Sequence, residues 1–373
     1  MKVMTIVGTR PELIRLCRTI SVLDEVFDHK LVHTGQNFDF ELNEVFFNDL
    51  EIRKPDYFLN ATGDNLGLTI GNIISTSYDV LKKENPDAVL ILGDTNSSLS
   101  AIVAKRLKIP IFHMEAGNRC FNMNVPEEIN RQIVDKISDI NLTYSKIARE
   151  YLIMEGFAPD RIIVTGSPIK EIVSYFQEKI KLSKILNQLN LEARDYFLLS
   201  LHREENVDDL ERLQKIIRSL MKVSEKFGKK IVFSVHPRTR KKLEDLEDFS
   251  SGHFIFCKPF GYFDYVTLQQ NSFCTLSDSG TISEEANILE FHAVNLRDEH
   301  ERPEAFESAA VPFSGINSSD IIRSVEISLR NGVTWKSEPV NDYKPENVSE
   351  KVASIISSYT HYANRVIWKK NKN

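Results

Sequence analysis

The sequence predicts an α/β protein with two doubly wound domains. Short apolar runs rich in β-branched residues alternate with amphipathic stretches long enough for helices, as in repeated βαβ units. Most of these runs are apolar throughout, which is typical of parallel strands covered on both faces. The chain also has 373 residues, more than one ordinary hydrophobic core accommodates.

The expected strands fall into two series. In the first domain they are Val3–Gly8, Lys30–Gly35, Ala88–Gly93, Ile109–His113, Ile140–Tyr144 and Ile162–Gly166. In the second domain they are Phe197–Leu201, Lys230–Val235, Phe254–Lys258, Phe273–Leu276 and Ala293–Leu296. The stretches between them have helical length, for instance Pro11–Val26, Gly71–Glu84 and Leu210–Phe227.

We expect the domain boundary near Ser167-Pro168, after the sixth strand. The first domain then covers residues 1–167 and the second residues 168–355. A last helix, roughly Asn347–Arg365, follows a proline-containing loop, and the segment from about 356 to 373 is expected to pack back on the first domain.

Composition excludes several classes of protein. A hydrophobic content of 42% and a charged content of 27% describe a soluble globular protein, and the net charge of −6 indicates no nucleic-acid or membrane surface. No run approaches the roughly 20 apolar residues that cross a bilayer, and we expect no signal peptide. The four cysteines are scattered, with no zinc-like spacing, so we predict a cytoplasmic protein without a required metal.

Polar motifs follow nearly every expected strand. In open α/β sheets, ligands bind beyond the carboxyl ends of the strands. We therefore expect these motifs to line one cleft between the two domains.

Two of these strand ends are candidate anion sites. Arg10, in Gly8-Thr9-Arg10-Pro11-Glu12, lies where a helix begins and backbone N–H groups favour anions; it is either a diphosphate contact or a surface arginine beside a capped helix. Ser279 and Gly280 open a second helix with small side chains, either for a phosphate or as a capping box. An acid in that helix could bind ribose hydroxyls. No Gly-x-Gly-x-x-Gly pattern indicates a dinucleotide redox cofactor.

Other strand-end residues of the second domain allow two interpretations. His202 is either a structural histidine or, beside Arg203, a diphosphate donor or general acid. His236 follows the next strand. Phe260 could stack on a base or simply pack.

Carboxylates gather in the first domain. Asp94 and Glu115 follow separate strands, and Glu127 opens a later helix. Asp94 could instead cap a helix, and Glu127 could form an i,i+4 ion pair with Arg131. Crowded acids move one another's pKa values apart, which supplies both an acid and a base near neutral pH.

These motifs carry a family resemblance. Six motifs resemble, in order along the chain, those of the non-hydrolysing UDP-N-acetylglucosamine 2-epimerase family. They are Gly8-Thr9-Arg10-Pro11-Glu12, Gly93-Asp94-Thr95, His113-Met114-Glu115-Ala116-Gly117, Pro126-Glu127-Glu128-Ile129-Asn130-Arg131, Asp278-Ser279-Gly280 and Glu301-Arg302-Pro303-Glu304. The resemblance implies a GT-B-like fold of two Rossmann-like domains with the active site between them. It also implies inversion at C2 of a UDP-N-acetylhexosamine without a cofactor, and a homodimer.

The resemblance assigns roles by motif. Asp94, Glu115, Glu127 and His202 are the expected catalytic residues. The UDP contacts are expected to be Arg10, Arg131, His236, Phe260, Ser279, Gly280, Thr281, Glu285 and Arg302, with Glu285 at the ribose. The sugar pocket is expected to include Arg15, Asn118 and Arg119.

Several departures resemble one branch of that family. Asn118-Arg119-Cys120 stands where the most familiar branch of the family has Leu-Arg-Thr, and the loop from there to Pro126 is shorter than in that branch. Arg15 and Thr281 stand where that branch has a lysine and a glycine. With His33–Asn37 and His202–Asn206, these features resemble enzymes that convert UDP-2-acetamido-2,6-dideoxy-L-talose to UDP-N-acetyl-L-fucosamine for capsule or O-antigen. The alternatives are conversion of UDP-N-acetylglucosamine to UDP-N-acetylmannosamine and, more distantly, a GT-B glycosyltransferase.

Overall fold

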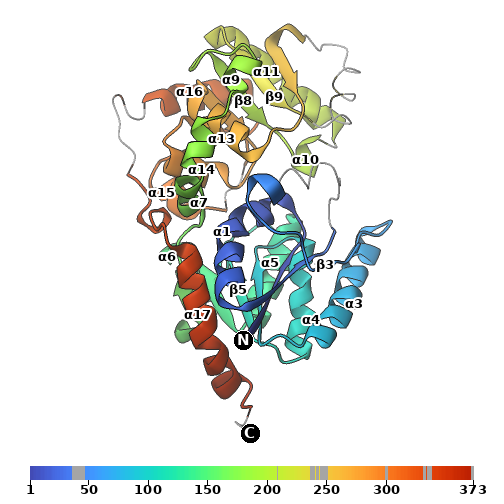
Figure 1. Ribbon diagram of the computed structural model, residues 1–373. Coiled ribbons are helices and arrows are strands. Elements are labelled where there is room, and N and C mark those ends of the chain that lie inside the picture. The colour runs from blue at the N-terminus through green and yellow to red at the C-terminus, as the bar shows by residue number, and fades with distance from the viewer. Residues whose placement is uncertain are drawn as a thin grey trace. The chain divides into compact units, whose positions relative to one another are not determined.

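The computed structural model describes residues 1–35, 47–207, 209–235, 240, 243, 251–298, 301–330, 333 and 338–370. The chain divides into two compact units. Unit 1 comprises Met1–Ser174 and Asp342–Asn373, and unit 2 comprises Tyr175–Asn341. Each unit has a parallel sheet with helices (Figure 1), so the predicted α/β fold class is confirmed.

The described residues of unit 1 form a seven-stranded sheet in the order β3-β2-β1-β4-β5-β6-β7, with every neighbouring pair parallel. The strands are β1 (Lys2–Val7), β2 (Asp28–His33), β3 (Tyr57–Phe58), β4 (Ala88–Leu92), β5 (Ile111–Met114), β6 (Ile140–Thr143) and β7 (Ile162–Val164). All but β3 match a predicted strand. A strand as short as β3 shows no hydrophobic periodicity, so the sequence does not reveal it.

The first helix of unit 1 shows why these residues form helices. Thr9 and Glu12 make a capping box at its start, and Leu13, Leu16 and Ile20 bury one face at helical spacing. The helices of unit 1 are α1 (Arg10–Val26), α3 (Leu66–Glu84), α4 (Ala101–Arg106), α5 (Pro126–Ile137), α6 (Lys146–Met154), α7 (Ile169–Tyr175) and α17 (Val348–Tyr362). Shorter turns are η1 (Asn96–Ser100), η2 (Pro159–Arg161), η4 (Asn341–Tyr343) and η5 (Ala363–Ile367).

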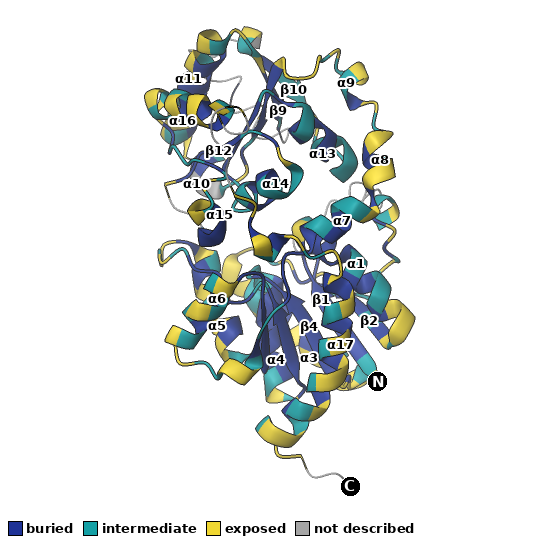
Figure 2. Cartoon of the chain, turned by 90° about the vertical axis from the view of Figure 1, so that its left-hand side faces the viewer, coloured by how far each residue is buried: buried dark blue, intermediate teal, exposed yellow. Residues whose placement is uncertain are grey.

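The sheet of unit 1 lies at the centre of its core. Every residue of β4 is buried, as expected for a strand covered on both faces. Figure 2 shows the strands of this sheet buried and the surrounding helices exposed along their outer sides. The cluster around Met4, Ile6, Val89 and Ile91 packs against α3, α4 and α5.

The described residues of unit 2 form a five-stranded sheet in the order β10-β9-β8-β11-β12, again parallel throughout. The strands are β8 (Tyr196–Ser200), β9 (Lys230–Ser234), β10 (Phe254–Cys257), β11 (Cys274–Ser277) and β12 (Ala293–Asn295). Each matches a predicted strand.

Alternate residues of β8 face two different cores. Phe197 and Leu199 join the larger cluster against α11 and α16, whereas Tyr196 and Leu198 join a smaller cluster with Leu268 of α13. The helices of unit 2 are α8 (Gln177–Lys181), α9 (Ile185–Gln188), α10 (Glu204–Val207), α11 (Leu210–Phe227), α13 (Tyr262–Asn271), α14 (Ile282–Leu289), α15 (Pro303–Glu307) and α16 (Ser318–Arg330), with the turn η3 (Ser251–His253).

The C-terminal segment belongs to unit 1, where α17 packs on α1 (Figure 1). The segment rejoins unit 1 at Asp342, earlier than residue 356, because loop contacts already hold it there. Asp342 accepts the N–H groups of Lys146 through its carboxylate, at 2.8 Å, and of Ser167 through its carbonyl, at 3.3 Å. The first crossing between the units lies at Ser174, seven residues beyond the position that the sequence suggests.

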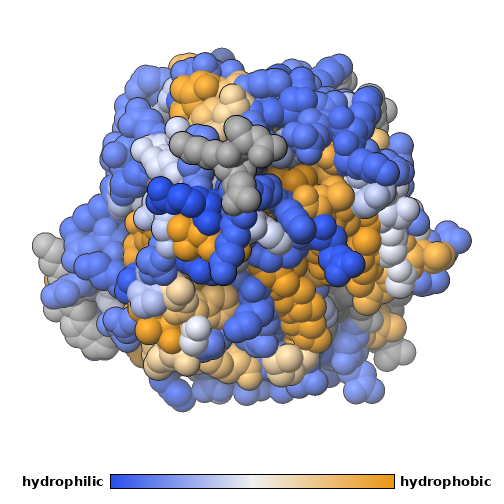
Figure 3. All heavy atoms as spheres, turned by 90° about the horizontal axis from the view of Figure 1, so that it is seen from below, coloured by the Kyte–Doolittle hydropathy of each residue, from blue (hydrophilic) through white to orange (hydrophobic). Residues whose placement is uncertain are grey.

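The surface mixes polar and apolar residues. Figure 3 shows hydrophobic patches between hydrophilic residues on the face seen from below. Within the described part of the chain, no helix is both long enough and apolar enough to cross a membrane.

Candidate active site

The polar motifs of each unit gather where the strand order reverses. In unit 1 the order reverses between β1 and β4, and in unit 2 between β8 and β11. Loops beyond the carboxyl ends of such strands separate from each other, and this is where ligands bind in open α/β sheets. Arg10 and Asp94 therefore lie at the switch point of unit 1, and His202 and Ser279 at that of unit 2.

Glu12 joins the two loops at the unit 1 switch point. Its Oε2 accepts the N–H groups of Gly8 and Thr9, each at 2.7 Å, and its Oε1 accepts the hydroxyls of Thr95 at 3.0 Å and Ser97 at 2.7 Å. Burial raises the pKa of Glu12, and these hydrogen bonds oppose that effect. The Thr9-x-x-Glu12 spacing is a capping-box signal, but the contacts of Glu12 with Thr95 and Ser97 cannot be read from it.

Glycine is required beside this carboxylate. A Cβ atom at Gly8 would lie 2.5 Å from Oγ1 of Thr34 and 2.8 Å from Cβ of Ser97. Gly8 thus lets the loop before α1 approach Thr34 and Ser97 closely, and half-buried Arg10 lies in the first turn of the helix. A diphosphate contact by Arg10 remains a prediction.

Glu115 has an unusual backbone conformation, and its carboxylate contacts Arg15 and Asn118. Its φ of 66° lies in the left-handed region that non-glycine residues rarely adopt. Nη1 of Arg15 lies 2.9 Å from its Oε2, and the amide of Asn118 donates to its Oε1 at 3.3 Å. Arg15 also lies over the ring of Tyr144, 5.6 Å from its centroid. Arg15 and Asn118, predicted as sugar contacts, thus come together around the carboxylate of Glu115.

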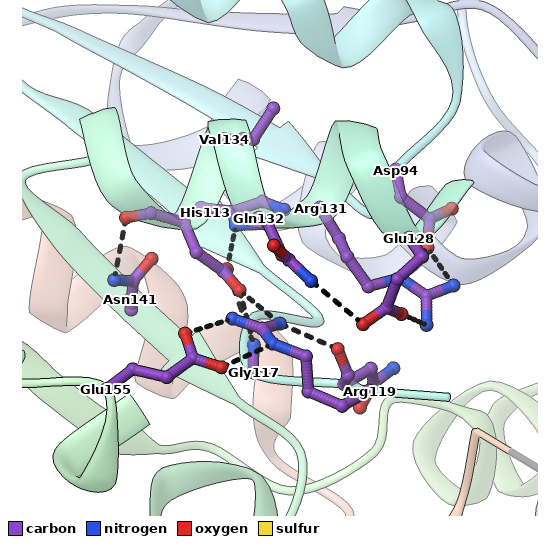
Figure 4. A network of polar contacts seen from close by, with 12 residues as sticks. Asp94, His113, Gly117, Arg119, Glu128, Arg131, Gln132, Val134, Asn141 and Glu155 are labelled. Carbon is purple, nitrogen blue, oxygen red and sulfur yellow. Dashed lines mark hydrogen bonds and ion pairs between the residues drawn. The ribbon is translucent and has the colours of Figure 1, made fainter. Parts of the chain in front are cut away.

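Asp94 pairs with Arg131 of α5. Nε and Nη2 of Arg131 lie 2.9 and 2.7 Å from Oδ2 of Asp94, and Nη1 lies 3.1 Å from the buried carboxylate of Glu128 (Figure 4). The i,i+4 partner considered for Arg131 was Glu127, but these contacts direct its guanidinium to Asp94 and Glu128. Arg131 is 3% exposed, so a UDP contact would have to use the little surface that it has left.

Glu127 differs from the other two acids. It is half-buried, and among the described residues no hydrogen bond or ion pair involves its side chain. Asp94 and Glu115 are thus each held by an arginine, whereas Glu127 has no such contact among the described residues. Carboxylates are common proton acceptors and donors in enzymes.

Contacts within the protein bury the side chain of Arg119. Its side chain is 1% exposed, with Nη1 2.7 Å from Asp135 and a paired contact of Nε and Nη2 to Glu155, each at 2.7 Å (Figure 4). Arg119 therefore has little surface left for a ligand, and its contact with the sugar stays a prediction. No sequence motif singles out Asp135, because its partners come from other segments.

In unit 2, Asp278 holds the loop after β8. It is fully buried, and it accepts the N–H groups of His202 and Arg203 and the amide of Asn206 at 3.0–3.2 Å. Nδ1 of His202 lies 3.1 Å from Oδ1 of Asp278, while 59% of the His202 side chain is exposed. Asp278 thus orients an exposed imidazole, as a donor to a ligand requires.

The segment after β11 opens α14 without the expected cap. The helix begins at Ile282, and Oγ of Ser279 accepts the N–H of Thr281 at 3.2 Å, so Ser279 does not form the capping box. A Cβ atom at Gly280 would lie 2.7 Å from Oε2 of Glu301. Glu285 accepts from Oγ1 of Thr281 and Nε2 of Gln269, each at 2.6 Å. A ribose contact by Glu285 and phosphate contacts by Ser279, Gly280 and Thr281 stay predictions.

The remaining predicted UDP contacts have different surroundings. Arg302 is 3% exposed and lies 3.3 Å from the fully buried Glu284. Phe260 packs against the smaller core cluster of unit 2, which favours the packing interpretation. His236 and the residues Gln36 and Asn37 lie outside the described residues. No group of three or more His, Cys, Asp or Glu side chains within the described ranges is placed to hold a metal ion.

His33, the last residue of β2, predicts a pH dependence of stability. It is 2% exposed, and burial lowers its pKa from 6.5 to about 4. Between pH 6.5 and about 4 the unfolded chain binds a proton that the folded chain does not. We therefore expect this residue to remove roughly 3 kcal/mol from the free energy of unfolding as the pH falls through that window.

The control is His33→Asn, which keeps an acceptor for the N–H of Gly35, 3.0 Å from Nδ1 in the structure, but does not titrate. The free energy of unfolding of both proteins is measured with urea from pH 8 down to about pH 4. The wild-type value should approach or cross that of the variant as the pH falls. A constant difference between the two would contradict the prediction.

Comparisons with known proteins identify the family of the chain. The family model of UDP-N-acetylglucosamine 2-epimerase matches residues 22–357. A solved structure of UDP-N-acetylglucosamine 2-epimerase from Rickettsia bellii is 49% identical, with a TM-score of 0.93, and covers 99% of this chain and 100% of its own. The Methanocaldococcus jannaschii UDP-GlcNAc 2-epimerase, solved with UDP-GlcNAc and UDP, is 36% identical with a TM-score of 0.88 over 96% of this chain and 99% of its own.

A relative named for a different sugar has the same sequence identity to this chain as the M. jannaschii enzyme. The UDP-2,3-diacetamido-2,3-dideoxy-D-glucuronate 2-epimerase of Pseudomonas aeruginosa is 36% identical over 88% of this chain and 92% of its own. Its name and those above share the inversion at C2 and differ in the sugar. The matches confirm the predicted family and GT-B-like fold class. The chain belongs to the UDP-N-acetylglucosamine 2-epimerase family, whose members are non-hydrolysing isomerases.

Proposed function

We propose that this protein inverts C2 of a UDP-N-acetylhexosamine by eliminating UDP and adding it back. The observation that carries the proposal is the set of three acids in unit 1: Asp94 and Glu115 are paired with arginines, and Glu127 has no such partner among the described residues. Such a set can accept a proton at one face of a carbon and deliver one at the other.

The chemistry follows from the substrate. C2 of such a sugar carries an unactivated C–H bond, so simple deprotonation is impractical. When a carboxylate takes the C2 proton, the C1–O bond to UDP breaks and a C1–C2 double bond forms. Delivery of a proton to the opposite face of C2 and return of UDP oxygen to C1 complete the inversion. His202, Arg10 and the Ser279-Gly280 segment are proposed to stabilise the departing diphosphate.

For the sugar we propose UDP-2-acetamido-2,6-dideoxy-L-talose, with UDP-N-acetyl-L-fucosamine as its epimer. The support is the resemblance of the segment Asn118-Arg119-Cys120 to the enzymes of that branch. This segment lies beside a proposed catalytic acid, because Asn118 donates to Glu115 at 3.3 Å. UDP-N-acetylglucosamine is the second candidate, because the R. bellii and M. jannaschii relatives are named for it. At 36% identity the P. aeruginosa relative is named for another sugar, so this level of similarity does not choose between them.

The experiment follows the C2 proton. Each UDP-sugar is incubated with the protein in deuterated water, and C2–H exchange and product are followed by NMR. We expect exchange and the L-fuco product with the L-talo substrate. Exchange with only the D-gluco substrate would contradict the proposed sugar. A lack of exchange with either sugar, or accumulation of free sugar and UDP, would contradict the proposed reaction; transfer to an added acceptor would favour a glycosyltransferase.

We further propose a cytoplasmic homodimer that makes precursors for capsule or O-antigen. This part rests on the family resemblance of the sequence motifs. Molecular mass in solution, measured by light scattering, tests the dimer.

A further inference from the structure

The backbone of Glu115 needs support from its surroundings. A φ of 66° is rare for a residue with a Cβ atom, and Gly117 follows with a φ of 79°. A Cβ atom at Gly117 would lie 2.4 Å from the carbonyl oxygen of Ala148, so this turn is also tightly enclosed. The turn directs the carboxylate of Glu115 to Arg15 and Asn118.

One buried carboxylate, Asp135 of α5, contacts this turn on both sides of Asn118. It accepts the N–H of Gly117 at 3.1 Å, and it lies 2.7 Å from Nη1 of Arg119. The same Nη1 donates to the carbonyl of Asn118 at 2.7 Å. Asp135 thus fixes the two residues that flank the amide partner of Glu115.

Asp135 also reaches the loop of Asp94. Nδ1 of His113 lies 2.9 Å from Oδ1 of Asp135, and Nε2 lies 2.8 Å from the carbonyl oxygen of Gly93, the residue before Asp94. Because Asp135 is fully buried, it cannot itself contact a substrate. Burial alone would raise the pKa of Asp135, but His113 and Arg119 outweigh that effect and lower it.

We propose that Asp135 is a positioning residue for the proton-transferring acids: it holds Glu115 in its left-handed conformation and, through His113, holds the loop of Asp94. The inference rests on the proposed function, in which these two acids handle the proton. Asp135 acts through ties to Gly117, Arg119 and His113 and not through contact with the sugar nucleotide.

Asp139 provides a matched control. It lies four residues further on, is 1% exposed, and also makes an ion pair and accepts a backbone N–H. Its partners are Nζ of Lys105 at 2.6 Å and the N–H of Ile111 at 3.0 Å. Ile111 is the first residue of β5, so Asp139 supports the end of the strand opposite Glu115.

The test compares Asp135→Asn with Asp139→Asn. Both changes should lower the thermal midpoint. We expect Asp135→Asn to lower kcat for epimerisation and C2–H exchange by about 10²-fold with little change in KM, because misplacing a reacting group costs rate rather than affinity. Asp139→Asn should keep kcat near the wild-type value. Equal losses in the two variants would overturn the inference and reduce Asp135 to a structural role.

A crystal structure of Asp135→Asn decides the inference without an activity assay. We expect Glu115 to leave the left-handed region and its contact with Arg15, 2.9 Å in the structure, to lengthen. An unchanged Glu115 would overturn the inference, even if wild-type protein showed no C2–H exchange and the proposed function had failed.

If Asp135→Asn does not fold, Arg119→Gln is the second variant, because it removes one contact with the same turn. A lower kcat at unchanged KM is again expected. An unchanged kcat would overturn the inference.

Discussion

Replacing Glu115 with glutamine is expected to lower kcat about 10³-fold, the range over which a positioned acid or base contributes to a reaction. Glutamine has the same shape but cannot exchange a proton as a carboxylate does. It also places a neutral amide beside Arg15, whose Nη1 lies 2.9 Å from the carboxylate in the structure. Turnover and C2–H exchange are measured by NMR, and UDP affinity by calorimetry. UDP affinity should survive, because the proposed nucleotide contacts lie mainly in unit 2.

Two further variants test this interpretation. Glu127→Gln should lower kcat to a similar extent and keep UDP affinity. Glu150→Gln, at an exposed position of α6, should leave both properties unchanged. If the main effect of Glu115→Gln were lost UDP affinity, Glu115 would be a binding residue and its proposed role in proton transfer would be wrong.

The second large effect is expected from Asp278→Ala. This change leaves the N–H groups of His202 and Arg203 and the amide of Asn206 without their buried acceptor. Each buried donor left unsatisfied costs of the order of 1–3 kcal/mol, so we expect a total loss of about 3 kcal/mol or more in the free energy of unfolding. UDP affinity should fall as well, because the loop that carries His202 loses its anchor.

The matched control is Asp209→Ala. Asp209 is exposed and accepts the N–H groups of Glu211 and Arg212 at the start of α11, at 3.0 and 3.1 Å. Loss of such a cap costs about 1 kcal/mol, and UDP affinity should not change. Urea unfolding and calorimetry measure both quantities. If the two variants lost equal stability, or if Asp278→Ala bound UDP as tightly as the wild type, the proposed role of Asp278 would be contradicted.

Much of the fold could be predicted because its signals are local. An apolar run such as Ala88–Leu92 is buried along its whole length, and this pattern is visible in the sequence. The short strand β3 has no such pattern and was missed. The return of the chain to unit 1 at Asp342 depends on contacts with Lys146 and Ser167, which no local pattern reveals.

The same distinction applies to the site. The motifs and their order identify the family and bring Asp94, Glu115 and Glu127 forward as candidate acids. The sequence alone does not say which arginine serves which acid. Local spacing suggested Arg131 for Glu127, whereas the folded chain pairs Arg131 with Asp94. Arg119, predicted at the sugar, forms ion pairs with Asp135 and Glu155, which the sequence does not reveal.

Periodicity, strand-end motifs and helix caps depend on residues a few positions apart, so the fold class and the family could be read from the sequence. The partners of the charged groups depend on which segments the sheet order brings together: Arg15 and Glu115 are 100 residues apart, and Arg131 and Asp94 are 37 apart. Burial then makes each such pair specific, because a charge removed from water must find a partner within hydrogen-bond reach. Only the tertiary structure could therefore show which acids are paired with arginine and that Glu127 makes no such contact among the described residues. It also shows that Asp135 accepts the N–H of Gly117 in the turn that carries Glu115.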